Sequence, residues 1–190
     1  MEGKNIMLVA PNTVKGASWI QNNVSDDMLG NAIREAQEEY LVTITGRLLL
    51  ERLKELVARS IDKLPDNIDS EENVCYKDLL DDYVVPYLTA QSVVSLCLPL
   101  TYKVRNMGVV QNTDTNVQSQ YIETVAKMQN HFRSDALRKA TALSKWLCKN
   151  RKCFDELNAS ACGCEPEQPQ IGKTFVNVPL NLGNGKKSCC

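Results

Sequence analysis

Residues 32–57, AIREAQEEYLVTITGRLLLERLKELV, contain the clearest structural pattern in the chain. Apolar residues recur in this stretch at steps of three and four, which is the spacing of one face of an α-helix. We expect the first helix to end or bend at Gly46, after which a second apolar stripe begins. The stretch therefore predicts two consecutive amphipathic helices whose apolar faces must be buried. The two stripes are Ile33, Ala36, Gln37, Tyr40, Leu41 and Ile44, then Leu49, Leu50, Leu53, Leu56 and Val57.

The first of these helices has a well-defined start. Ser25 is a good N-cap residue, and Asp26 and Asp27 place negative charge in the first turn, at the positive end of the helix dipole. Residues 1–24 precede this helix and predict an extended arm, because IMLV could form a short strand and APNTVKG is rich in turn-forming residues.

A third helix is expected after the second. A polar, acidic loop over residues 61–74 separates the two. The apolar pattern then predicts a helix over residues 76–98, and Pro86 inside it should kink or divide the helix. The segment that follows contains Asn106 and Gly108, which we expect to act as turn residues.

The last helix is expected over residues 117–150. At 1.5 Å per residue it would be about 50 Å long, which is more than a compact domain of this size needs. A helix of that length often projects or packs against a second copy of the protein. Its expected buried side comprises Val117, Tyr121, Val125, Met128, Phe132, Ala136, Leu143 and Trp146.

Together these elements predict an all-α fold, an antiparallel helical bundle with a long C-terminal helix. We expect an N-terminal arm over 1–24, a helical domain over 25–150 and an extended, cysteine-rich tail over 151–190. In the tail, the apolar residues of KTFVNVPLNLG nearly alternate, which is typical of a β-strand. Because a single strand must pair with something, we expect it to bind a partner. The residues of this partner-binding strand are Phe175, Val176, Val178, Leu180 and Leu182.

The overall composition is that of a globular protein. The chain has 190 residues, enough for one domain with a real core, and 43% of them are hydrophobic. A formal net charge of -1 excludes a protein that binds as a polyelectrolyte. We find no apolar run near the roughly 18 residues that a membrane span needs, and no cleavage site after the start, so we expect mature sequence and no membrane partner.

Residues with catalytic or metal-binding chemistry are few. The single histidine, His131, lies inside a predicted helix with no nucleophile turn beside it, so we expect no enzyme and no cofactor. Reduced thiols are the first expectation for the eight cysteines, and a zinc ion held by four of them is kept as an alternative. These four are Cys148, Cys153, Cys162 and Cys164.

Charge is unevenly distributed along the chain. Residues 25–72 carry 12 acidic and 6 basic side chains, whereas residues 118–150 carry 2 acidic and 6 basic ones. Solvated helix faces commonly explain such an imbalance. An acidic and a basic region on one molecule also suit head-to-tail packing between copies, in which different surfaces meet.

Several motifs follow one another in a recognisable order. They are an Ala-Gln-x-x-Tyr stripe with a Thr-Gly break (Ala36, Gln37, Tyr40, Thr45, Gly46), a helix exit of the form Lys-x-x-Asn-x-Gly-Val (Lys103, Asn106, Gly108, Val109) and the closing helix HFRSDALRKATALSKWLCKN. Over residues 5–150 this order resembles the tailed-bacteriophage head–tail connector (adaptor) proteins of crAss-like and related Bacteroides-type phages. The cysteine-rich end from Arg151 onward departs from that pattern.

The resemblance implies a structural virion protein made in the cytoplasm of a bacterial host. It implies a homo-oligomeric ring of twelve copies at the head–tail junction, bound to the portal protein on one side. A tail protein or second ring protein would dock on the other side, and packaged DNA would pass through the lumen without specific binding. It implies no catalysis, no cofactor and no metal.

Two alternatives from other classes stay open. One is a helical nucleic-acid-binding regulator that uses the basic last helix; we expect its bases to be spread around the helix, which counts against reading of a DNA groove. These bases are Lys127, Arg133, Arg138, Lys139, Lys145 and Lys149. The other alternative is an adaptor of host origin stapled by zinc, which metal analysis would identify.

Overall fold

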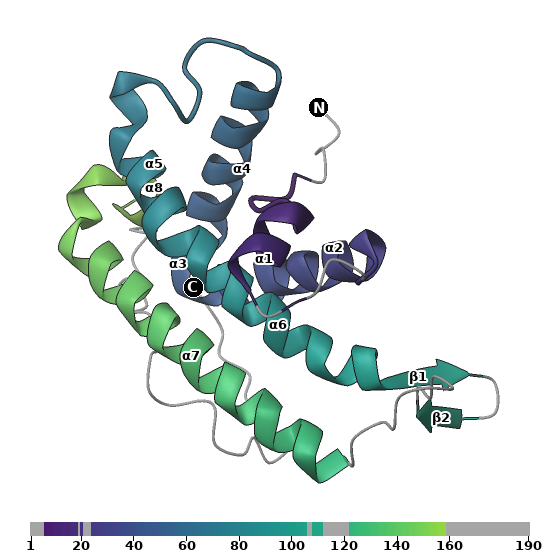
Figure 1. Ribbon diagram of the computed structural model, residues 1–190. Coiled ribbons are helices and arrows are strands. Elements are labelled where there is room, and N and C mark those ends of the chain that lie inside the picture. Colours follow the sequence, from purple (N-terminus) through teal and green to yellow (C-terminus); the bar gives the residue numbers. More distant parts are fainter. Residues whose placement is uncertain (1–5, 19, 21–23, 106–107, 112–121, 159–190) are drawn as a thin grey trace, which may run out of the picture.

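The computed structural model describes residues 6–18, 20, 24–105, 108–111 and 122–158. The described part of the protein is mostly helical, which confirms the all-α class in its coarse form (Figure 1). The helices are α1 (Pro11–Ala17), α2 (Asp26–Glu35), η1 (Ala36–Leu41), α3 (Val42–Thr45), α4 (Arg47–Ile61), η2 (Glu71–Asn73), α5 (Val74–Leu79), η3 (Leu80–Val84), α6 (Val85–Thr101), α7 (Ile122–Lys149), η4 (Arg151–Cys153) and α8 (Asp155–Asn158).

The two helices predicted from residues 32–57 are confirmed. The run α2–η1–α3 ends at Gly46, whose φ of 75° is a backbone conformation that glycine adopts without strain. Ser25 stands at the N-cap position of α2, although its side chain makes no capping hydrogen bond. The inward faces of both helices are buried in the main core, as the two apolar stripes predicted.

Helix α6 lies at the centre of the molecule. It packs along α7 on one side and against α2 on the other, and α5 and η3 precede it in a continuous helical run (Figure 1). Leucines from α2, α4, α5, α6 and α7 fill the core between these helices. The largest fully buried ones are Leu29, Leu49, Leu50, Leu53, Leu56, Leu79, Leu88, Leu96 and Leu143.

A π-helical segment stands just before Pro86, where the sequence predicted a kink or a division, and the helical run continues through the proline. Proline has no N–H to donate to the carbonyl four residues earlier, and its ring clashes with that carbonyl in a regular α-helix. The π-helical segment η3 ends two residues before Pro86 and separates α5 from α6. The carbonyl four residues before Pro86 belongs to Asp82, which lies within this π-helical segment.

The central helix also corrects the expectation about apolar runs. The helical run Glu71–Leu100 is long and apolar enough to cross a membrane by length and composition alone. Residues 83–100 contain no charged side chain, which the sequence analysis overlooked. Buried core helices of globular proteins share this length and composition, and 56% of the most apolar part of this run is buried inside the protein.

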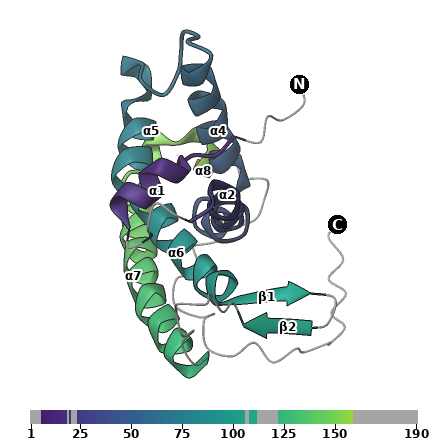
Figure 2. The same ribbon diagram turned by 45° about the vertical axis from the view of Figure 1, so that its right-hand side comes forward.

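A β-hairpin leads away from the end of α6. Strands β1 (Tyr102–Arg105) and β2 (Gly108–Gln111) pair antiparallel, with Tyr102 opposite Gln111 (Figure 2). The sequence pattern predicted only turn residues here, so both strands are an unpredicted feature. The two views agree that the hairpin projects from the helical body.

Both ends of the helical region differ from the prediction. The arm expected to be extended contains α1, whose Val14 is fully buried. At the other end, residues 151–158 were assigned to an extended tail, but they form η4 and α8 and bury Phe154 completely. The packed unit therefore continues to Asn158.

The last helix is shorter in the described residues than predicted. Helix α7 has 28 residues, which corresponds to about 42 Å, and residues 112–121 lie outside the described part of the chain. Val125, Ala136 and Leu143 are buried as expected, whereas Met128 is 52% exposed. The prediction for Met128 was wrong because Gln129 occupies the inward position next to it, where its side chain reaches α6.

Candidate functional site

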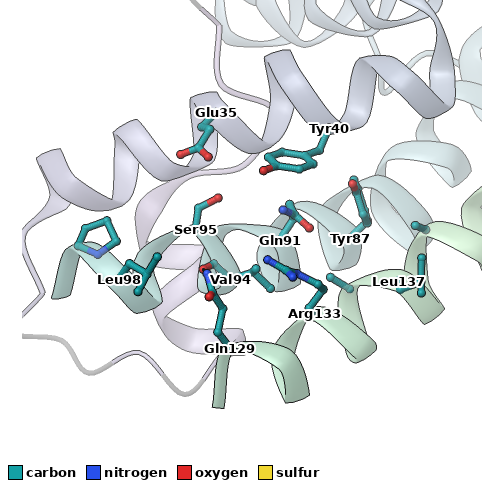
Figure 3. Close-up of a pocket in the computed structure, with 13 residues that line it drawn as sticks. Glu35, Tyr40, Tyr87, Gln91, Val94, Ser95, Leu98, Gln129, Arg133 and Leu137 are labelled. Atoms are coloured by element: carbon teal, nitrogen blue, oxygen red, sulfur yellow. The ribbon is translucent and has the colours of Figure 1, made fainter. Parts of the chain in front are cut away.

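A pocket of about 470 Å³ lies between the α2–η1 run, α6 and α7. One wall comes from α2 and η1, the floor from α6 and the other wall from α7 (Figure 3). Small and apolar side chains of α6 and α7 alternate with polar ones around it. The lining consists of Glu35, Tyr40, Tyr87, Gln91, Val94, Ser95, Leu98, Pro99, Gln129, Arg133, Ala136, Leu137 and Ala140.

Polar groups from all three walls converge on this pocket (Figure 3). The phenol of Tyr87 is only 4% exposed, and burial, together with the nearby Tyr40, raises the pKa of its hydroxyl. Gln91 is 8% exposed and forms no hydrogen bond among the described residues. Gln129 Nε2 donates to the Val94 carbonyl at 3.2 Å, which joins α7 to α6. The pocket thus offers donors and acceptors beside apolar surface, the usual composition of a binding site.

Opposite charges stand on two sides of the pocket. Glu35 comes from the end of α2 and Arg133 from α7, and both side chains are exposed. Within the described residues neither forms an ion pair. His131 is exposed on α7, where its ring lies 5.9 Å from that of Phe132, and it is not part of the pocket lining.

A second polar feature holds the N-terminal segment to the helices. Gln37 is completely buried in η1, and its amide makes two hydrogen bonds with the backbone of the arm. Leu8 N donates to Gln37 Oε1 at 2.9 Å, and Gln37 Nε2 donates to the Ile6 carbonyl at 3.0 Å. The side-chain amide therefore binds both a donor and an acceptor of the arm backbone. We call this arrangement the arm clasp.

The cysteines do not form a cluster in the described residues. Cys148 and Cys153 are exposed free thiols, and Cys162 and Cys164 lie outside the described residues. A hydrogen bond with the Cys153 thiol, followed by burial, raises the pKa of Cys75 to about 11. Among residues 6–158 that are described, no group of three or more histidines, cysteines or carboxylates is placed to hold a metal ion.

The predicted strand residues Phe175, Val176, Val178, Leu180 and Leu182 also lie outside the described residues. The pocket and the clasp were not predicted as sites. Each has one indication in the sequence, a polar residue inside an apolar helical stripe. This residue is Gln37 for the clasp and Gln91 for the pocket. That pattern predicts a buried amide but does not identify its partner.

The fold and these features define a mostly helical protein with a mixed polar and apolar pocket between helices. The chain belongs to the DUF6712 family, a family of unknown function, and the match covers residues 41–167. That range contains α6 and α7, and therefore the floor and one wall of the pocket. No match was found among curated proteins or among solved structures.

Proposed function

We propose that this protein is a structural virion subunit, a head–tail connector (adaptor) of a tailed bacteriophage. In this role it is an antiparallel helical bundle that assembles as a homo-oligomeric ring under the portal protein, made in the cytoplasm of a bacterial host. The ring extends the DNA channel and docks a tail protein or second ring protein. The activity is assembly, and no catalytic step is part of the proposal.

The observation that carries this proposal is the arm clasp. The Ala-Gln-x-x-Tyr stripe is the first motif of the resemblance, and Ala36 and Gln37 of that stripe are completely buried. Gln37 hydrogen-bonds to the backbone of residues 6–8 through both its amide oxygen and its amide nitrogen, and the nitrogen also donates to Glu38 Oε1 at 3.2 Å. A motif that fixes the root of a terminal arm suits a subunit whose arms reach neighbouring proteins.

The direct test is the mass of the purified chain by light scattering at rising concentration, with and without a chelator, followed by electron microscopy. We expect a discrete, chelator-resistant oligomer with a central opening, formed by the chain alone or after addition of portal protein. A chain that stays monomeric under both conditions would overturn the proposal.

The predicted partner-binding strand, Phe175 to Leu182, belongs to the same proposal. Because Phe154 is buried, the informative truncation ends after Asn158 and leaves the described helices intact. We expect this shortened chain to keep its helical circular dichroism and to lose binding to the ring's neighbours. Rings that still bind portal protein after the truncation would remove the strand from the interface.

One observation favours the alternative function, a nucleic-acid-binding regulator. Four exposed bases of α7 follow one another at spacings of 11, 7 and 4 residues, which places them within about 40° on the helix. The expectation that the bases are spread around the helix was therefore wrong for these four. We call them the basic stripe: Lys127, Arg138, Lys145 and Lys149. Duplex binding that weakens steeply with salt, and that is lost on substitution of the stripe by alanine, would favour this function.

A further inference from the structure

The loop between α4 and α5 forms an acidic end of the molecule, at the top of Figure 1. Residues 61–78, which we call the acidic cap, contain six acidic and two basic side chains. Three large apolar side chains are also exposed there. Ile61 is 66%, Leu64 49% and Val74 52% exposed to solvent. Apolar side chains surrounded by carboxylates are typical of a surface that binds a partner.

Hydrogen bonds hold the backbone of the acidic cap in one conformation. Leu64 N donates to the Arg59 carbonyl at 2.9 Å, and Lys63 has a φ of 53°, which together end α4 in a Schellman-type turn. Asp66 accepts hydrogen bonds from Arg59 at 3.1 Å and from Asn73 at 3.2 Å. The cap is therefore preorganised, and a partner that binds it does not have to order a loop.

The cap uses some of its carboxylates internally and leaves others without an ion pair. Asp69 accepts from Lys77 at 2.5 Å and from Ser60 at 2.8 Å, and the hydrogen bond from Lys77 is the main reason that the pKa of Asp69 is lowered. Glu71 and Glu72 are exposed and form no ion pair with any described residue. These two carboxylates are directed to solvent in the single copy.

The basic stripe has the complementary properties. Asp135 pairs with Arg138 and with Lys139, whereas Lys127, Lys145 and Lys149 form no ion pair among the described residues. Lysine and arginine carry long apolar stems below their charges, so a row of them can cover apolar side chains and bind carboxylates at once. The stripe therefore matches both the charge and the apolar character of the cap.

We propose that the acidic cap of one copy of this protein docks on the basic stripe of a second copy. The proposal rests on the connector function and names the surfaces through which its subunits contact one another. Because the cap and the stripe are different surfaces, each copy can bind one neighbour through its cap and another through its stripe. Such head-to-tail contacts close into a ring when the rotation between copies permits it.

The test uses charge reversal at exposed positions of the full chain. The cap variant is Glu71→Lys with Glu72→Lys, and the stripe variant is Lys127→Glu with Lys145→Glu. Between two copies of the same variant, the substituted side chains face side chains of the same charge across the contact. We therefore expect self-association, measured by analytical ultracentrifugation, to weaken by about tenfold or more. In a one-to-one mixture the lysines introduced into one cap can pair with the glutamates introduced into a neighbouring stripe, and we expect association to recover toward the wild-type level.

A matched control separates this contact from general charge effects. Glu39→Lys with Asp82→Lys makes the same change in net charge as the cap variant, at exposed positions of η1 and η3 that lie outside the cap, the stripe and the pocket lining. We expect this control to self-associate as the wild type does. Equal weakening in the control, or a mixture that stays dissociated, would overturn the proposed contact.

Three further outcomes are informative. A wild-type chain that is monomeric at every concentration overturns the contact, whereas the connector function would still be tested by adding portal protein. Rings that persist in both reversal variants overturn the contact and support the connector function through other surfaces. If the stripe variant loses binding to duplex DNA while self-association is unchanged, the stripe serves nucleic acid and the contact is again overturned.

Discussion

The two ends of the described chain are anchored to the helical core by different physical means. At the N-terminal end, residues 6–8 are fixed by the arm clasp, in which one completely buried, uncharged amide binds two backbone groups. At the C-terminal end, residues 151–158 are fixed by an aromatic side chain and by the hydrogen bond and ion pair of one carboxylate.

The C-terminal anchor depends mainly on packing. Phe154 is completely buried, with its ring 5.1 Å from that of Tyr76 in an edge-on arrangement and 5.8 Å from that of Trp146. Beside it, Tyr76 Oη donates to Glu156 Oε2 at 2.9 Å, and Arg52 Nε lies 3.9 Å from the same carboxylate. The stability of the C-terminal anchor should therefore depend on side-chain volume and on pH. The stability of the N-terminal anchor should depend only on its hydrogen bonds.

The largest effect is expected at Phe154. Phe154→Ala removes a fully buried ring and leaves a cavity between α5 and α7, which costs about 3–5 kcal/mol of the free energy of unfolding. Urea unfolding followed by circular dichroism measures this loss. Phe132→Ala is the matched control, because that ring is only half-buried on α7 and its removal should cost clearly less. Equal losses in the two variants would contradict the role of Phe154 as an anchor.

The second effect is expected at the arm clasp. Gln37→Leu removes both hydrogen bonds to the arm and leaves the buried N–H of Leu8 without its partner, which costs about 2–3 kcal/mol. The same change should speed proteolytic removal of the arm under native conditions, because the backbone of residues 6–8 is released.

Gln91→Leu provides the control for that experiment. Gln91 is also buried but forms no hydrogen bond among the described residues, so an apolar side chain of similar size loses nothing there. We expect its free energy of unfolding and its arm proteolysis to match those of the wild type. If Gln37→Leu behaves like Gln91→Leu, the clasp does not hold the arm.

The sequence was sufficient where contacts follow local periodicity. Apolar residues spaced by three and four residues predicted α2 and α4, and Gly46 predicted the break between them. The same rule placed Gln37 on a buried face, which is correct. These successes have one cause, since a helix face is determined by residues within a few turns of each other.

The anchors could not be predicted because their partners are distant in the sequence. The partner of Gln37 is the backbone of Leu8, 29 residues earlier, and a backbone group has no signature in the sequence. Phe154 is one aromatic residue in a polar stretch, so it forms no periodic pattern, and its contact with Tyr76 joins segments 78 residues apart. The pocket could not be predicted for the same reason, because its lining comes from helices that are distant in the sequence.

The last prediction separates the two anchors by pH. Burial, followed by the hydrogen bond to Glu156, raises the pKa of Tyr76 to about 12, whereas a tyrosine in an unfolded chain titrates near pH 10. Between these values the unfolded chain loses a proton that the folded protein keeps, so this contribution to stability is present below about pH 10 and is lost as the pH rises through about 12.

Tyr76→Phe should cost about 1 kcal/mol at neutral pH, since the lost hydrogen bond is partly exposed to solvent. It should also flatten the fall in stability above pH 10, measured by urea unfolding at each pH. Gln37→Leu removes no ionisable group and should leave that slope as it is in the wild type, so equal slopes in all three proteins would show that the C-terminal anchor does not depend on the Tyr76 hydroxyl.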